Sequence, residues 1–104
     1  MLESYLERKF AKAIKNIGGQ ALKFTSPGMA GVPDRLVLLP GGKVIFAELK
    51  KPGEKLRPLQ LKRKKDLEAL GFLVEVVDSI PRIEEVCHGI RTTQLSGLCD
   101  QRSD

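Results

Sequence analysis

The chain of 104 residues predicts a single α/β domain, with a small mixed four-stranded sheet flanked by helices on both faces. Three observations support this class. Apolar residues recur at helical spacing near the start, two apolar strand-like runs flank a Pro-Gly-Gly turn, and a helical segment links the second run to a further strand. The predicted order is helix, three strands, helix, strand and a short last helix. The domain covers residues 1–90, and residues 91–104 are expected to form a flexible tail.

The first half of the chain predicts one helix and three strands. Leu6, Phe10 and Ile14 lie on one face of a helix over residues 2–17, which the following Gly18-Gly19 ends. Residues 21–25 form a short predicted strand, and residues 26–31 a loop. Residues 36–39 and 43–49 are apolar on both faces, as strands of a sheet covered on both sides are.

The second half predicts a crossover. Pro58 suits the first turn of a helix that runs to about Leu70 and stops at Gly71. Residues 72–77 follow as a strand, which must run parallel to the strand at 43–49 because a helix connects the two. Ser79 can cap the last helix, which we expect to end near Gly89.

Charge indicates the class of partner. A net charge of +5 and a pI near 9.4 favour nucleic acid or an anionic membrane surface, although a general solubilising charge explains the totals equally well. The clustering favours nucleic acid, because basic residues crowd the segment directly after the strand at 43–49. The predicted phosphate-binding residues are Lys51, Lys55, Arg57, Lys62, Arg63, Lys64 and Lys65.

Other classes receive no support from the sequence. Cys87 and Cys99 lack metal-site or disulfide-framework spacing, and the charged N-terminus does not resemble a signal peptide. No apolar run is long enough to span a bilayer, so an intracellular, cytoplasmic protein without a membrane partner is expected. The glycines form no Walker or dinucleotide-binding loop, and no organic cofactor is expected.

Strand register decides whether Asp34 and Glu48 can act together. A two-residue Gly41-Gly42 turn would place Asp34 opposite Leu49, with its side chain on the wrong face. A three-residue loop, residues 40–42, pairs Leu39 with Lys43 and sets Asp34 opposite Glu48. We predict the second register, since glycine at the last loop position suits the left-handed backbone that such loops need.

This register would bring two carboxylates and the Lys50 ammonium together, because Glu48 and Lys50 are two apart on one strand. Magnesium prefers oxygen ligands and is usually held by one or two carboxylates with water and substrate phosphate. Asp34 and Glu48 are therefore candidate ligands for Mg²⁺ or Mn²⁺, and Lys50 a catalytic cation. The alternative is a weak surface ion pair between Lys50 and one acid.

These elements resemble those of the PD-(D/E)xK nuclease superfamily, and more closely its virus-type replication-repair (VRR-NUC) branch. The resemblance extends to about Ser79. It rests on Glu7, Gly18-Gly19, Lys23-Phe24, Ser26-Pro27-Gly28, Gly31-Val32-Pro33-Asp34, Glu48-Leu49-Lys50, Pro58-Leu59-Gln60, Gly71-Phe72 and Val76-Val77-Asp78-Ser79. It implies a restriction-endonuclease-like fold and a divalent-metal-dependent DNA endonuclease.

The resemblance also implies roles for three further residues. Glu7 would be an additional acidic ligand or water-bridged partner of the metal, the Leu49 carbonyl oxygen a further ligand, and Gln60 an accessory catalytic residue. Without the resemblance, Glu7 and Gln60 would be read as ordinary polar helix residues.

The resemblance further implies selectivity for branched DNA, including four-way (Holliday) junctions, and a phage origin. A domain this small would hardly grip two strands alone, so we expect a two-fold homodimer. Two alternatives remain open: a non-catalytic DNA-binding module that uses only the basic face, and an endonuclease that cuts ordinary duplex at a short sequence.

Overall fold

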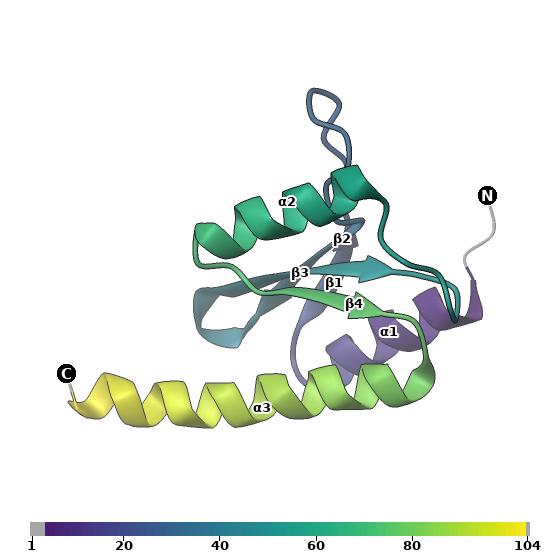
Figure 1. Ribbon diagram of the computed structural model, residues 1–104. Coiled ribbons are helices and arrows are strands. Elements are labelled where there is room, and N and C mark those ends of the chain that lie inside the picture. The colour runs from purple at the N-terminus through teal and green to yellow at the C-terminus, as the bar shows by residue number, and fades with distance from the viewer. Residues whose placement is uncertain (1–3, 104) are drawn as a thin grey trace.

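The computed structural model describes residues 4–103, and the side chains of residues 4–92. Its elements follow the predicted order (Figure 1). They are α1 (Tyr5–Asn16), β1 (Gln20–Lys23), β2 (Arg35–Leu39), the 3₁₀ turn η1 (Pro40–Gly42), β3 (Lys43–Leu49), α2 (Pro58–Ala69), β4 (Val74–Val77) and α3 (Ile80–Ser103).

The four strands form one mixed sheet in the order β1-β2-β3-β4. β1 pairs with β2 and β2 with β3 in antiparallel fashion, whereas β3 and β4 are parallel. The predicted crossover through α2 is therefore confirmed, and it makes β3 a central strand with a neighbour on each side.

The β2–β3 turn has the predicted three-residue form. Leu39 is paired with Lys43, and the ladder continues to Arg35 opposite Ala47. Gly41 and Gly42 have φ angles of 82° and 77°, which residues with a Cβ atom rarely adopt. One further step along the ladder places Asp34 opposite Glu48, so the register on which the candidate site depends is confirmed.

Helices cover both faces of the sheet (Figure 1). α1 and α3 pack against one another on one face, and α2 crosses the other face beside β4. The main core lies between the sheet and the α1–α3 layer. Its buried members are Phe10, Ile14, Val37, Leu39, Ile45, Ala47, Val77, Ile83, Val86, Cys87 and Ile90. Within the described residues, no helix is long and apolar enough to cross a membrane.

The first helix begins later than the sequence predicted, and residues 1–3 lie outside the described part of the chain. Ser4 is the N-cap: its Oγ accepts a hydrogen bond from the Glu7 N–H at 3.1 Å, while the Ser4 N–H donates to Glu7 Oε1 at 2.7 Å. This reciprocal capping box satisfies two backbone donors and starts the helix at Tyr5. It also holds the Glu7 carboxylate at the start of α1.

The last helix is longer than predicted, because it continues past Gly89 to Ser103. Ile83, Val86, Cys87 and Ile90 are buried at helical spacing on both sides of Gly89, so packing holds the helix through that position. A single glycine costs a helix only about 1 kcal/mol relative to alanine. The flexibility expected of residues 91–104 stays a prediction.

A long loop (residues 24–34) joins β1 to β2 and projects from the sheet beside the start of α2 (Figure 1). We call it the β1–β2 loop, and residues 26–31 its tip. Its base is closed by the Phe24 N–H, which donates to the Asp34 carbonyl oxygen at 2.9 Å. Gly31, at φ 85°, packs so closely on α2 that an added Cβ would lie 2.7 Å from Leu59 Cγ.

We expect Gly31→Ala to destabilise the protein by about 1–3 kcal/mol, because the new methyl group would meet Leu59 in a strained backbone conformation. Gly28→Ala is the matched control, since an added Cβ there meets nothing within 4 Å. It should change the free energy of unfolding by no more than about 0.5 kcal/mol. Urea unfolding measures both, and equal effects would contradict the close packing of Gly31.

Candidate active site

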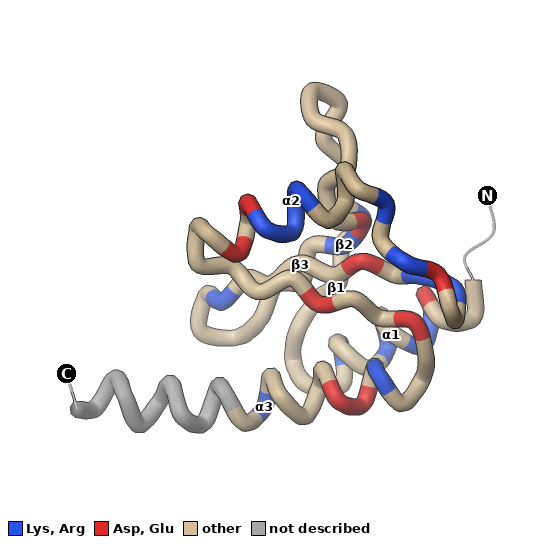
Figure 2. Tube along the Cα trace, in the orientation of Figure 1, with Lys and Arg blue, Asp and Glu red and all other residues tan. Residues whose placement is uncertain are grey.

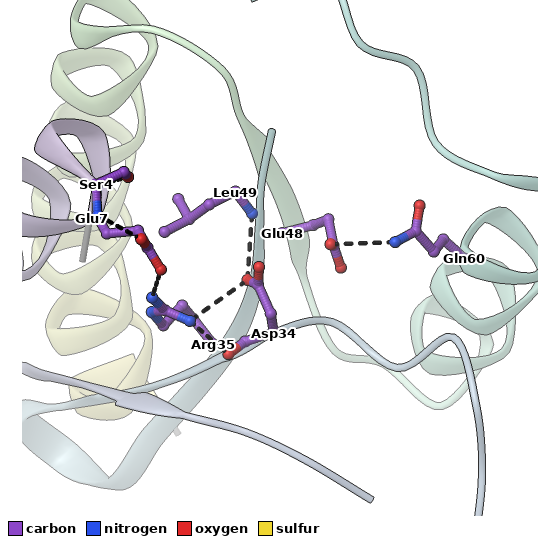
Figure 3. A network of polar contacts seen from close by, with 7 residues as sticks. All are labelled: Ser4, Glu7, Asp34, Arg35, Glu48, Leu49 and Gln60. Atoms are coloured by element: carbon purple, nitrogen blue, oxygen red, sulfur yellow. Dashed lines mark hydrogen bonds and ion pairs between the residues drawn. The ribbon is translucent and has the colours of Figure 1, made fainter. Parts of the chain in front are cut away.

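Asp34 and Glu48 lie at the same end of the β2–β3 pair. The Asp34 Oδ1 atom accepts a hydrogen bond from the Leu49 N–H at 3.2 Å, so its carboxylate is held against β3 (Figure 3). Glu48 lies within β3 and is only 6% exposed. The two carboxylates are close enough for the charge on Asp34 to raise the pKa of Glu48. The structure therefore brings together the two acids that the sequence singled out.

Burial disfavours the ionised form of both carboxyl groups. Desolvation, with the charge of Asp34 as the second cause, raises the pKa of Glu48 from 4.5 to about 7. Desolvation also raises the pKa of Asp34, although the Leu49 N–H and Arg35 oppose the shift. Two half-desolvated acids side by side form a site that favours a proton or a cation.

Lys50 supplies a positive charge to this pair. Its side chain follows Glu48 by two residues and lowers the pKa of both carboxyl groups. Within the described part of the chain, no carboxylate lies within 4.0 Å of its ammonium, so the simple ion pair considered as an alternative is not formed. Its ammonium is therefore available to a ligand.

Gln60 connects α2 to the acid pair. Its side-chain oxygen accepts from the Arg57 N–H at 2.9 Å, which turns its amide nitrogen toward Glu48. That nitrogen donates to Glu48 Oε2 at 3.3 Å (Figure 3). The structure thus places Gln60 beside Glu48, and the geometry of the first turn of α2 sets its orientation.

Glu7 has a different environment from the other two acids. Its carboxylate forms an ion pair with Arg35, and Arg35 lies between it and Asp34 (Figure 3). The hydrogen bond from the Ser4 N–H is the largest cause of a lowered pKa for Glu7. Among the side chains that the structure describes, no three His, Cys, Asp or Glu residues gather into a group that could hold a metal. Glu7 is instead paired with Arg35 in this structure, and its expected role as a third acid, direct or through water, stays a prediction.

Arg35 is the residue that sequence reasoning missed. It is 6% exposed, donates to the Asp34 carbonyl oxygen at 3.0 Å, and lies 3.9 Å from Asp34 Oδ1. A signal was present, because Arg35 shares its face of β2 with the buried Val37 and Leu39. A charged residue at such a position needs a buried partner, and the Ser4-x-x-Glu7 capping pattern would have pointed to Glu7.

A cavity of about 670 Å³ opens beside Asp34 and Lys50. It lies between the start of α1, the segment after β3 and the start of α3, and its wall includes Glu7 and Leu49. The cavity makes the Asp34–Lys50 side of the site accessible to a ligand.

The predicted basic residues divide into two groups. Lys62 and Arg63 pair with Asp66, Lys64 pairs with Glu68, and Arg63 also donates to the Ala30 carbonyl oxygen at 2.9 Å. Lys51, Lys55, Arg57 and Lys65 are exposed and form no ion pair within the described residues. Figure 2 shows basic positions in the segment before α2 and along that helix. The first group is partly neutralised, and the second is the more available to phosphate.

Comparison with known proteins supports a nuclease. No family model matches the chain. The chain is 53% identical over 77 residues to the protein named "Putative nuclease p44" of Acyrthosiphon pisum secondary endosymbiont phage 1, covering 74% of this chain and 83% of that protein. A solved structure titled "VRR_NUC domain" matches with a TM-score of 0.76 and 28% identity, over 80% of this chain and 90% of that one.

We expect Glu48→Gln to stabilise the metal-free protein at pH 8 by on the order of 1–3 kcal/mol. Because the pKa of Glu48 is raised from 4.5 to about 7, its stabilising contribution is complete below pH 4.5 and is lost as the pH rises through 7. The glutamine carries no charge, so its advantage should vanish at pH 4.

Thermal or urea unfolding in EDTA at the two pH values measures this difference. Glu84→Gln, on the exposed face of α3, is the matched control and should change stability little at either pH. A Glu48→Gln gain that is the same at pH 4 and pH 8 would contradict the raised pKa.

Proposed function

Because the chain belongs to the VRR-NUC family of nucleases, we propose that it is a divalent-metal-dependent endonuclease that hydrolyses phosphodiester bonds in branched DNA. The observation that carries the proposal is the register of β2 and β3, which sets Asp34 beside Glu48 with Lys50 adjacent. The match to a phage protein also supports a phage-encoded enzyme that acts inside the host cell.

The acid pair fits a hard divalent cation. Both groups offer oxygen ligands, and burial raises the pKa of each, so a bound cation would relieve the repulsion between them. Asp34 and Glu48 would hold Mg²⁺ or Mn²⁺ with the Leu49 carbonyl oxygen and water. The ion would neutralise charge on the scissile phosphate and lower the pKa of a bound water. The role of Glu7 as a ligand, direct or through water, stays a prediction.

Lys50 would stabilise the reaction through its charge. A lysine ammonium is a compact cation that can orient the attacking water or neutralise the phosphate as negative charge builds up. The cavity beside Lys50 and Asp34 gives the phosphate access to it. Lys50 is therefore the proposed catalytic cation.

Two other side chains would keep the acids in place. Gln60 donates to Glu48 and so fixes the orientation of that carboxylate. Arg35 contacts both Glu7 and the Asp34 backbone, which ties β2 to the start of α1. Their contribution is positional, because pre-set ligands need no rearrangement when the substrate binds.

The basic surface would hold the DNA backbone. Lys51, Lys55 and Arg57 lie in the segment that joins β3 to α2, directly after Lys50, so a strand whose phosphate reaches Asp34 would have these cations near its path. Phosphate contacts release counterions, and affinity should therefore fall steeply as salt rises. Selectivity for branches, including four-way junctions, and a two-fold homodimer with two sites are parts of the same proposal.

The experiment that tests the function compares labelled four-way junctions with linear duplexes of the same sequence, in Mg²⁺, in Mn²⁺ and in EDTA. We expect cleavage of the junction with either metal and none in EDTA. Binding without cleavage under all conditions would indicate a non-catalytic module. Cutting of linear duplex at one fixed sequence would refute branch selectivity. Light scattering at the assay concentration tests the homodimer.

We expect Asp34→Asn to reduce the cleavage rate on the order of 10³-fold, because several kcal/mol of transition-state stabilisation depend on the ligand charge. Asparagine keeps an oxygen that can accept the Leu49 N–H, so the circular dichroism spectrum and the affinity for DNA should be unchanged. A variant with full activity would remove Asp34 from the mechanism.

We expect Lys50→Ala to lower the single-turnover cleavage rate on the order of 10²-fold, with little change in metal or DNA affinity. Lys51→Ala is the matched control, one residue further along and exposed. Lys51→Ala should weaken DNA binding and reduce the salt dependence of the binding constant by about the contribution of one phosphate contact. The cleavage rate at saturating protein should be unchanged. A loss of stability in Lys50→Ala in place of a loss of rate would argue for a structural lysine.

A further inference from the structure

The β1–β2 loop differs in chemistry from the rest of this basic protein. Between Lys23 and Asp34 lie ten residues without a charge, in a chain of which 30% of residues are charged. Figure 1 shows the loop projecting beyond α2, and Figure 2 shows no charged position along its projecting part. A surface that only gripped phosphates would carry lysine or arginine there.

The tip of this loop is apolar and exposed. Pro27, Gly28, Met29 and Ala30 all face solvent, and Met29 is 48% exposed. Methionine and proline are among the side chains that proteins insert between DNA base steps as wedges. The tip therefore has apolar side chains that could insert between bases, and it has no cationic side chain that could bind a phosphate.

Three contacts anchor the tip to itself and to α2. The Met29 N–H donates to the Ser26 carbonyl oxygen at 3.0 Å across a turn in which the ring of Pro27 restricts φ. Arg63 Nε donates to the Ala30 carbonyl oxygen at 2.9 Å, and Gly31 packs directly on Leu59. A loop anchored at these points loses less conformational entropy on binding, which favours insertion between bases.

The loop is connected both to the acid pair and to the basic helix α2, the two parts of the proposed DNA site. Its last residue is Asp34, and Arg63 anchors it to the basic helix α2. DNA with a phosphate at Asp34 and its backbone along the segment before α2 would therefore meet the tip within a few nucleotides of the cut.

We propose that residues 26–31 form a wedge whose Met29 and Pro27 pack against exposed base faces at the branch point of a DNA substrate. The inference rests on the proposed function and specifies how branched DNA is selected. Separating stacked bases costs a few kcal/mol per step in a continuous duplex, and less where strands already part. The wedge thus favours branched over linear DNA without reading sequence.

The first measurement follows wedge insertion without cleavage. A four-way junction with 2-aminopurine at the branch point is mixed with Asp34→Asn protein in Mg²⁺. Fluorescence should rise as the base loses its stacked neighbour, and a continuous duplex with the same label should show little rise. Met29→Ser in the same background should abolish the rise, and Met29→Leu should retain it because leucine is also apolar and of similar size.

The second measurement is the ratio of junction to duplex cleavage rates in the otherwise unaltered protein. Met29→Ser should lower this ratio by about tenfold, which corresponds to about 1.4 kcal/mol of lost contact. The duplex rate should be unchanged, because Met29 does not belong to the acid pair. Met29→Leu should keep the ratio.

Several results would overturn the wedge. One is a 2-aminopurine fluorescence that does not rise at the branch point, or that rises equally with Met29→Ser, even if cleavage is normal. Another is a junction-to-duplex cleavage ratio that Met29→Ser leaves unchanged. A protein-docking role for the tip would produce this pattern. A Met29-dependent rise with no cleavage by the parent protein in Mg²⁺ or Mn²⁺ would uphold the wedge and refute the hydrolytic function.

Discussion

The pairing of two like charges at one end of the β2–β3 hairpin is the constraint on which the rest of the structure depends. Each carboxylate is partly removed from water, and burial raises the pKa of both. Such an arrangement is unfavourable unless donors and cations surround it. The Leu49 N–H, the Gln60 amide and the Lys50 charge all act in this way. The surrounding groups thus offset part of the cost of bringing the two acids together.

Each helix at the site reaches one of the two acids. α1 extends to Asp34 through Glu7 and Arg35, and α2 extends to Glu48 through Gln60 (Figure 3). Both connections use a first-turn glutamate or glutamine whose side chain also caps its own helix. Helix starts, which need side-chain acceptors for their free N–H groups, therefore serve here to position the two acids as well.

The surface around the acids combines three kinds of chemistry along a short path. An acid pair with a lysine is suited to the phosphodiester, exposed lysines and Arg57 to the backbone, and the uncharged β1–β2 loop to base faces. α2 links them, because Gln60 contacts Glu48, Leu59 packs on Gly31, and Arg63 holds the loop. One helix therefore supports both the acid pair and the β1–β2 loop.

Local sequence determined the elements, the crossover and the hairpin register, because apolar spacing, Pro58 and the Pro-Gly-Gly turn act over a few residues. The register in turn placed Asp34 opposite Glu48.

The tertiary structure decided which groups surround the two acids. Arg35 is paired with Glu7, because a buried arginine on the core-facing side of β2 needs an acidic partner and α1 supplies one. The continuation of α3 through Gly89 was likewise decided by packing, because buried residues on both sides of Gly89 outweigh the low helix propensity of glycine. Spacing along the chain reveals neighbours within an element or a hairpin, whereas contacts between elements depend on how their faces meet.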